Sequence, residues 1–137
     1  GGVASCPLPR MAGVLIPEPQ ARALASLAAC VDEGLPPAGT FVDFSNMGAL
    51  YFLLDRPAPS RYLYTVYAAT HAMQREMIAD LEEIRPGLML TSDVLGIAAI
   101  DGGPNERRHP LLAEYLDAHY PDGVEAGFGT VHRRRDR

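Results

Sequence analysis

The sequence contains no tryptophan and no lysine, only two cysteines, and no long apolar run. Because a helix needs about 20 consecutive apolar residues to cross a bilayer, we predict no membrane-spanning segment within these 137 residues. The N-terminus lacks a charged stretch followed by an apolar one, so we expect no signal peptide. Twelve basic residues stand against 17 acidic ones, giving a formal net charge of −5. Since nucleic-acid-binding domains need a basic face, we expect no nucleic acid among the partners.

The common catalytic and cofactor motifs are also missing. There is no GxxxxGK[ST] phosphate loop, no GxGxxG after a predicted strand, no GxSxG and no HExxH. The four histidines have no pairwise spacing that suits a metal site on a helix; they are His71, His109, His119 and His132. We therefore expect no cofactor, no metal site and no catalytic residue of a known motif.

The two cysteines, Cys6 and Cys30, lie too far apart for a CxxC redox or zinc motif. One interpretation is that both are small, half-buried thiols, as free cysteines often are. The other is that they form a disulfide in an oxidising compartment, which would tie the N-terminal segment to the first helix. The sequence leaves both open.

The composition indicates a globular protein, with 47% apolar and 21% charged residues. A chain of 137 residues favours one domain. Glycines and prolines interrupt residues 1–16, which we predict to be an extended N-terminal arm with a short strand at 11–16. Residues 17–133 form the predicted α/β domain, and the arginine-rich residues 134–137 form a solvated basic tail.

Hydrophobic periodicity predicts helices and strands in alternation. Helices are expected at 17–34, 47–54, 70–85 and from 110 to about 120, and strands at 40–44, 61–67, 88–91 and 124–133. The last strand could instead be a hairpin bent at Gly127 and Gly129. Residues 94–100 are apolar and ambiguous between strand and loop, and 101–105 read as a turn. Alternation of this kind predicts a small, mostly parallel sheet of about four strands flanked by helices, Rossmann-like in its layers but without a dinucleotide fingerprint.

The apolar faces of these elements predict the core. The side chains expected to be buried are Phe41 or Val42, Leu50, Tyr51, Leu81, Leu90 and Leu116.

Polar residues follow the strand at 40–44 directly. In open parallel sheets, ligands bind beyond the carboxyl ends of the strands, where helix N-termini point. Asp43 and Asn46 are therefore candidate ligand-binding residues. The simpler alternative is that Asp43 and Ser45 satisfy backbone N–H groups of the turn. A third hypothesis makes Asp43 or His71 the general base of a small enzyme.

Two arginines frame a rigid turn after the helix at 47–54. The turn reads Arg-Pro-Ala-Pro-Ser-Arg-Tyr at 56–62, and its prolines restrict the backbone of the residues before them. We predict that Arg56 and Arg61 share one edge with Asn46 and contact a saccharide or a phosphate-bearing headgroup, since a guanidinium can hold phosphate through two parallel hydrogen bonds. The alternative is that the arginines pair with Asp43 or Asp55 and pin the turn.

The segment 44–62 also carries a resemblance. It combines an aromatic strand end with Asn46, a Leu-Tyr-Phe-Leu helix at 50–53 and the Arg-Pro-x-Pro-Ser-Arg-Tyr turn. This pattern resembles the C-terminal extracytoplasmic domain of polytopic bacterial membrane glycosyltransferases, the group similar to dolichyl-phosphate-mannose protein mannosyltransferases. Ser60 stands where threonine is commoner in that group. The likeness extends over about residues 17–135, through the helix end at 81–86, the strand at 88–90 and the terminal arginines.

The resemblance implies a role outside catalysis. In such enzymes the membrane part holds the lipid-linked sugar donor, and acidic residues of an early extracytoplasmic loop perform catalysis. The chain would then be a cap domain on the extracytoplasmic face of a bacterial inner membrane. Its expected partners are the transmembrane portion of the parent protein and a saccharide or lipid-linked sugar headgroup. The alternative from the residues alone is a free-standing α/β protein that binds a small molecule.

Overall fold

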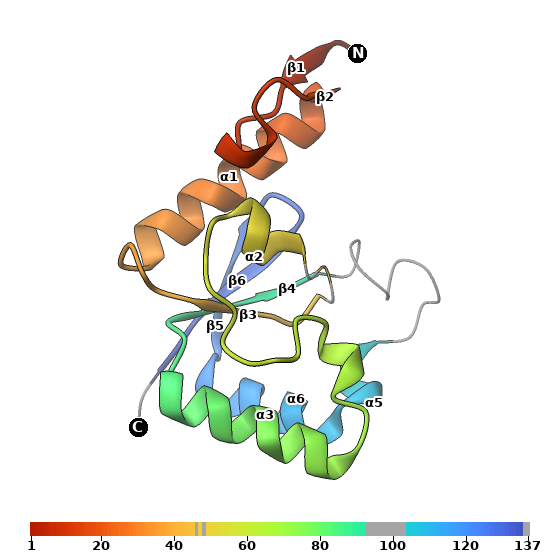
Figure 1. The fold of residues 1–137 in the computed structure, drawn as a ribbon, viewed down its shortest axis with the longest axis vertical. Coiled ribbons are helices and arrows are strands. Elements are labelled where there is room, and N and C mark those ends of the chain that lie inside the picture. Colours follow the sequence, from red (N-terminus) through yellow and green to blue (C-terminus); the bar gives the residue numbers. More distant parts are fainter. Residues whose placement is uncertain (46, 48, 93–103, 136–137) are drawn as a thin grey trace.

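The computed structural model describes residues 1–45, 47, 49–92 and 104–135 and shows a mixed α/β fold with two sheets (Figure 1). Predictions for Asn46, for 94–100, for the turn at 101–103 and for the chain end at 136–137 lie outside these residues. The strands are β1 (Val3–Ser5), β2 (Leu15–Pro17), β3 (Phe41–Asp43), β4 (Leu88–Thr91), β5 (Asp122–Ala126) and β6 (Gly129–Arg133). The helices are α1 (Glu18–Gly34), α2 (Ala49–Leu53), α3 (His71–Ile84), α5 (Asn105–Arg108) and α6 (Pro110–His119), with short 3-10 turns η1 (Pro9–Met11) and η2 (Thr65–Tyr67).

The main sheet has four strands in the order β3-β4-β6-β5. Strands β3 and β4 are parallel, whereas β6 is antiparallel to both β4 and β5. The predicted mostly parallel, Rossmann-like sheet is therefore wrong, although the α/β class is confirmed. The reason is the short link between β5 and β6, since parallel neighbours need a crossover of a dozen or more residues. The hairpin alternative for the last segment is the one that the structure shows.

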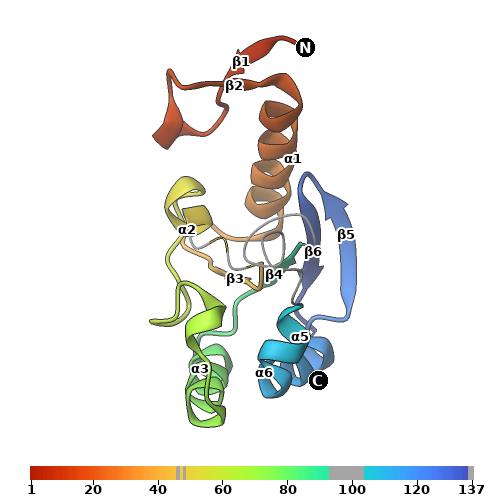
Figure 2. The same ribbon diagram turned by 90° about the vertical axis from the view of Figure 1, so that its right-hand side faces the viewer.

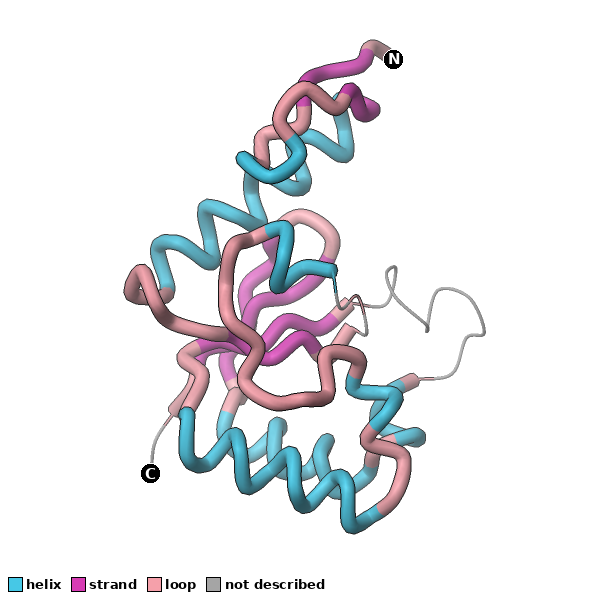
Figure 3. The backbone as a smooth tube through the Cα atoms, in the orientation of Figure 1, coloured by secondary structure: helices cyan, strands magenta, loops and turns pink. Residues whose placement is uncertain are grey.

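Helices cover both faces of this sheet (Figures 2 and 3). Because alternate strand residues point to opposite faces, Phe41 and Leu88 pack in a cluster with α1 and α2, whereas Val42 and Met89 pack with α3 and α6. Every predicted core side chain is buried, as is each of Phe41 and Val42. Among the described residues, no helix has the length and apolar character that a membrane crossing requires.

The N-terminal arm folds back on itself. Strands β1 and β2 form a two-stranded antiparallel sheet in which Val3 pairs with Pro17, and the pair lies beside the start of α1 (Figure 1). Cys6 and Leu8 are buried there, and both cysteines are free thiols. The arm thus packs against α1 and α2, outside the two core clusters of the sheet.

The strand predicted at 61–67 is wrong. The chain instead makes a turn in which Tyr62 N–H donates to Ser60 Oγ at 3.0 Å, followed by η2. Tyr62 and Thr65 are buried while Leu63 and Tyr64 between them are exposed. Burial therefore recurs every three residues, which suits a helical turn, and the period of two that a strand requires is missing.

Arg134, the first residue of the predicted basic tail, packs against the domain. The Arg134 side chain is buried and donates to Tyr115 Oη at 3.1 Å and to Glu82 Oε1 at 3.3 Å. The N–H of Arg134 also donates to the carbonyl of Gly87 at 2.9 Å. Arg134 therefore joins the residues that follow β6 to α3 and α6.

Candidate functional site

Asp43 ends β3 with its side chain buried. Its Oδ1 accepts from the N–H of Ser45 at 2.9 Å and from the Ser45 hydroxyl, and its Oδ2 accepts from the N–H of Met47 at 3.0 Å. These are the bonds expected when a carboxylate satisfies the backbone of a turn, which is the simpler alternative that the sequence offered. A ligand contact of Asp43 stays a prediction.

The backbone around Asp43 is tied to three other elements. Its N–H donates to Tyr51 Oη of α2 at 2.8 Å, and its carbonyl accepts from Thr65 Oγ1 of η2 at 3.1 Å. The next carbonyl, that of Phe44, accepts from Asn105 Nδ2 of α5. Burial raises the pKa of Tyr51 well above its ordinary value, so this hydroxyl stays protonated. Side chains from α2, η2 and α5 consequently hold the end of β3 in place.

Arg56 is almost wholly buried and holds the loop between α1 and β3. One guanidinium nitrogen, Nη2, lies 2.8 Å from Asp32 Oδ1 of α1. The other, Nη1, donates to the carbonyls of Pro36, Pro37 and Gly39 at 2.5, 3.2 and 3.3 Å. The predicted pairing of this arginine with Asp43 or Asp55 is wrong, because its carboxylate partner is Asp32.

Arg61 turns to a different helix. Its Nη2 lies 2.9 Å from Glu76 Oε2 of α3 and 2.9 Å from Tyr62 Oη, and Tyr62 Oη donates to the same carboxylate at 2.7 Å. These hydrogen bonds lower the pKa of Glu76. Since Arg56 faces α1 and Arg61 faces α3, the two guanidinium groups do not share the predicted edge.

The histidines occupy unlike positions. His71 is exposed at the first residue of α3. His109 is buried between α5 and α6, with Nδ1 3.2 Å from the carbonyl oxygen of Ala68. Within the part of the chain that the structure describes, His109 Nε2 has no hydrogen-bond partner. Across the same residues, no group of three or more His, Cys, Asp or Glu side chains could hold a metal ion.

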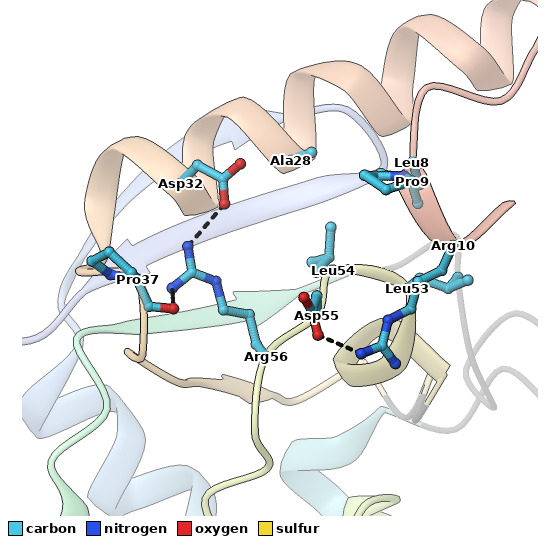
Figure 4. A pocket seen from close by; sticks show the side chains of 10 residues that line it. All are labelled: Leu8, Pro9, Arg10, Ala28, Asp32, Pro37, Leu53, Leu54, Asp55 and Arg56. Carbon is cyan, nitrogen blue, oxygen red and sulfur yellow. Dashed lines mark hydrogen bonds and ion pairs between the residues drawn. The ribbon is translucent and has the colours of Figure 1, made fainter. Parts of the chain in front are cut away.

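A cleft of about 290 Å³ lies between the N-terminal arm, α1 and α2 (Figure 4). Arg56 and Asp32 pair at one side of it, and Arg10 of the arm pairs with Asp55 at the other. Apolar side chains lie between the two ion pairs. The lining consists of Leu8, Pro9, Arg10, Ala28, Asp32, Pro37, Leu53, Leu54, Asp55 and Arg56. We call this cavity the ionic cleft.

The chain matches no protein-family model, no curated protein and no solved structure. The features of this protein that bear on its function are the sequence of the segment 44–62 and the geometry of the described surface.

The lining of the ionic cleft suits binding. It offers hydrogen-bond donors from two guanidinium groups and acceptors from two carboxylates, and the described residues that line it include no histidine, cysteine or serine. Arg56 was predicted from the sequence as a ligand-binding residue and does line the cleft. Arg10 and Asp32 were missed, because nothing in their local sequence distinguishes them from other surface charges.

Proposed function

We propose that this chain is a non-catalytic extracytoplasmic domain of a membrane-bound, glycosyltransferase-like protein, in which it assists acceptor recognition or assembly. The observation that carries the proposal is the segment 44–62, which joins an aromatic strand end, a Leu-Tyr-Phe-Leu helix and an Arg-Pro-x-Pro-Ser-Arg-Tyr turn. The domain would lie on the extracytoplasmic face of a bacterial inner membrane, next to the transmembrane portion of the parent protein.

The places that these motif residues take in the fold support the proposal. Leu50 and Tyr51 are core residues, and the Tyr51 ring stacks on Phe41 with centroids 4.7 Å apart. Arg56 fixes the loop before β3, and Tyr62 is buried against α3. The residues of the motif thus contribute to the core and to the loop before β3, as parts of a domain-wide motif would.

The ionic cleft supports the binding part of the proposal. Its wall includes Arg56, and its donors and acceptors are of the kind that saccharide hydroxyl groups need. A saccharide or lipid-linked sugar headgroup is therefore the proposed ligand. Ligand contacts of Asp43 and Asn46 stay predictions from the sequence, whereas Arg61 pairs with Glu76 of α3 and lies outside the ionic cleft.

The decisive experiment is to determine the coding sequence upstream of Gly1 in the source genome. We expect the same reading frame to encode several apolar stretches of about 20 residues each, as a polytopic protein requires. A reading frame without such stretches would overturn the proposal. The ionic cleft would then favour the alternative, a free-standing α/β protein that binds a small molecule.

A further inference from the structure

A second cavity adjoins the ionic cleft. It has a volume of about 460 Å³ and is lined by Arg10, Tyr51, Phe52, Asp55, Arg56, Pro57, Ala58 and Leu63. Arg10, Asp55 and Arg56 also line the ionic cleft, so the two cavities share a wall. The remaining side chains are apolar or aromatic. We call this second cavity the apolar groove.

The apolar groove presents large side chains to water. Phe52 is 59% exposed and Leu63 is 46% exposed, and Arg10 lies over the Phe52 ring with Cζ 4.4 Å from its centroid. Exposed apolar side chains gathered at a cavity, with polar groups at the rim, are typical of ligand-binding grooves. Covering Phe52 and Leu63 with an apolar group would remove that surface from water.

The ionic cleft has different chemistry. Its two arginines and two aspartates cancel in charge, so it offers no net attraction to an anion or a cation. Asp32 and Asp55 nevertheless keep 69% and 76% of their side chains exposed, so both carboxylates can accept further hydrogen bonds. A hydroxyl group both donates and accepts, and a ring that carries several hydroxyls can therefore use both kinds of partner here.

We propose that the ionic cleft and the apolar groove form one binding site for an uncharged amphipathic glycoside. The sugar ring would occupy the ionic cleft, and its apolar substituent would lie in the groove against Phe52 and Leu63. The glycosidic linkage between them would cross the wall formed by Arg10 and Asp55. The inference deepens the proposed function, since it names the class of saccharide that the domain recognises, but it can be tested on this chain alone.

The test is a titration of the ¹⁵N-labelled chain with n-octyl β-D-glucoside below its micelle concentration, followed by amide chemical shifts. Methyl β-D-glucoside and 1-octanol are the two half-ligands. Since each buried methylene strengthens binding by about fourfold, we expect the octyl glucoside to bind at least tenfold more tightly than methyl glucoside and also more tightly than octanol. Shifts should appear both at Ala28 and Leu54 and at Leu63. Equal affinity for octanol, or shifts confined to one cavity, would overturn the proposal, as would no binding.

Two variants locate the sugar ring. Ala28 lines the ionic cleft, whereas its neighbour Ala29 is exposed outside it on the same helix. Ala28→Leu should fill the cleft and weaken octyl glucoside binding at least tenfold, while Ala29→Leu, with the same change in volume, should leave the affinity within twofold. An equal effect of the two variants contradicts the assignment. The dispersion of amide signals reports whether each variant is folded.

A second pair locates the apolar substituent. Leu63→Ser should weaken octyl glucoside binding without changing the weak affinity for methyl glucoside. Val124→Ser is the matched control, because Val124 is 59% exposed on β5 and lines neither cavity. Loss of methyl glucoside binding in Leu63→Ser would contradict the two-part site. If the chain does not bind octyl glucoside, the upstream reading frame can still encode apolar stretches. If the upstream frame lacks such stretches, the chain can still bind the glycoside, so the two proposals fail separately.

Discussion

Arg56 illustrates how much one buried cation can hold together. It bonds to Asp32 and to three backbone carbonyls of the loop between α1 and β3. Removing it leaves those carbonyls and Asp32 without their charged partner, and a hydrogen bond to a charged group contributes about 1.5–3 kcal/mol. We expect Arg56→Ala to lower the free energy of unfolding in urea by at least about 2 kcal/mol.

Arg61→Ala is the matched control for that measurement. Arg61 also pairs with a carboxylate, but its side chain and that of Glu76 are exposed, and exposed ion pairs contribute about 0–1 kcal/mol. We expect a loss of less than about 1 kcal/mol. Equal losses in the two variants would show that Arg56 is no more structural than Arg61.

His109 gives a prediction about pH. Burial lowers the pKa of His109 in the folded chain, and the positive charge of Arg108 acts in the same direction. The unfolded chain therefore takes up protons below about pH 6.5 while the folded chain does not. Stability should be full above pH 6.5 and should decline as the pH falls toward 5. Urea titrations across this range measure the slope.

His132 contributes with the same sign, because burial lowers its pKa as well. The double variant His109→Gln/His132→Gln should accordingly have a flatter profile between pH 7 and 5 than the parent chain. Glu76 and Glu82 affect stability at lower pH values than the histidines do. Their pKa values are lowered in the folded chain, so the stability they contribute is lost only as the pH falls below about 4.5. An unchanged slope above pH 5 in the double variant would contradict the assignment to histidine.

At the scale of elements, helix periodicity gave the most dependable predictions. Helices α1 and α3 and strands β3 and β4 lie within a few residues of their predicted bounds, because their apolar stripes and their proline and glycine ends are local features. The directions of the strands in the sheet could not be predicted in the same way. Strands β4 and β5 run the same way through α5 and α6, yet β6 inserts between them. Nothing local to 124–133 specifies that insertion.

The α3 face can be tested at Leu81. Leu81 is fully buried in the cluster between α3 and α6, whereas Ile84, three residues later, is 49% exposed. Leu81→Ala should cost about 2–5 kcal/mol of unfolding free energy if the site cannot collapse. Ile84→Ala on the same helix should cost under about 1 kcal/mol, since a half-exposed side chain leaves no cavity. A loss under about 0.5 kcal/mol for Leu81→Ala would mean that this helix face is misassigned.

The turn between β5 and β6 depends on Gly127. Its φ is +64°, and a Cβ built there would lie 2.2 Å from the carbonyl oxygen of Ala23 in α1. Gly13 has a comparable φ of +84° with nothing within 4 Å of such a Cβ. Gly13→Ala should therefore cost about 1–2 kcal/mol for the backbone conformation alone, and Gly127→Ala about 1–3 kcal/mol more for the clash. Equal thermal shifts would show that α1 can move away from the hairpin.

At the scale of the whole molecule, the ionic cleft is lined by residues that lie far apart in the sequence and could not be predicted together from it. Arg56 could be identified because the surrounding prolines make its segment distinctive. Asp32 lies 24 residues before it and pairs with it across the packing of α1. Arg10 lies 46 residues before it and lines the same cleft because the β1–β2 hairpin folds the arm back toward α1 and α2. Such convergence depends on long-range packing of Cys6 and Leu8, which spacing along the chain does not encode.

The last prediction concerns activity. The ionic cleft offers paired charges and hydrogen-bonding groups, and both carboxylates among its described lining residues, Asp32 and Asp55, are held in ion pairs with arginines. If the chain is a recognition domain, the purified 137 residues should transfer no sugar from a lipid-phosphate donor to any acceptor. If the proposed function is correct, a longer protein contains this chain and transfers sugar. Ala28→Leu in that protein should then raise the KM for the acceptor while leaving kcat nearly unchanged, because it removes binding that ground state and transition state share. Ala29→Leu should change neither constant. Turnover by the isolated chain would place catalytic groups within these residues and would end the assignment of a non-catalytic role.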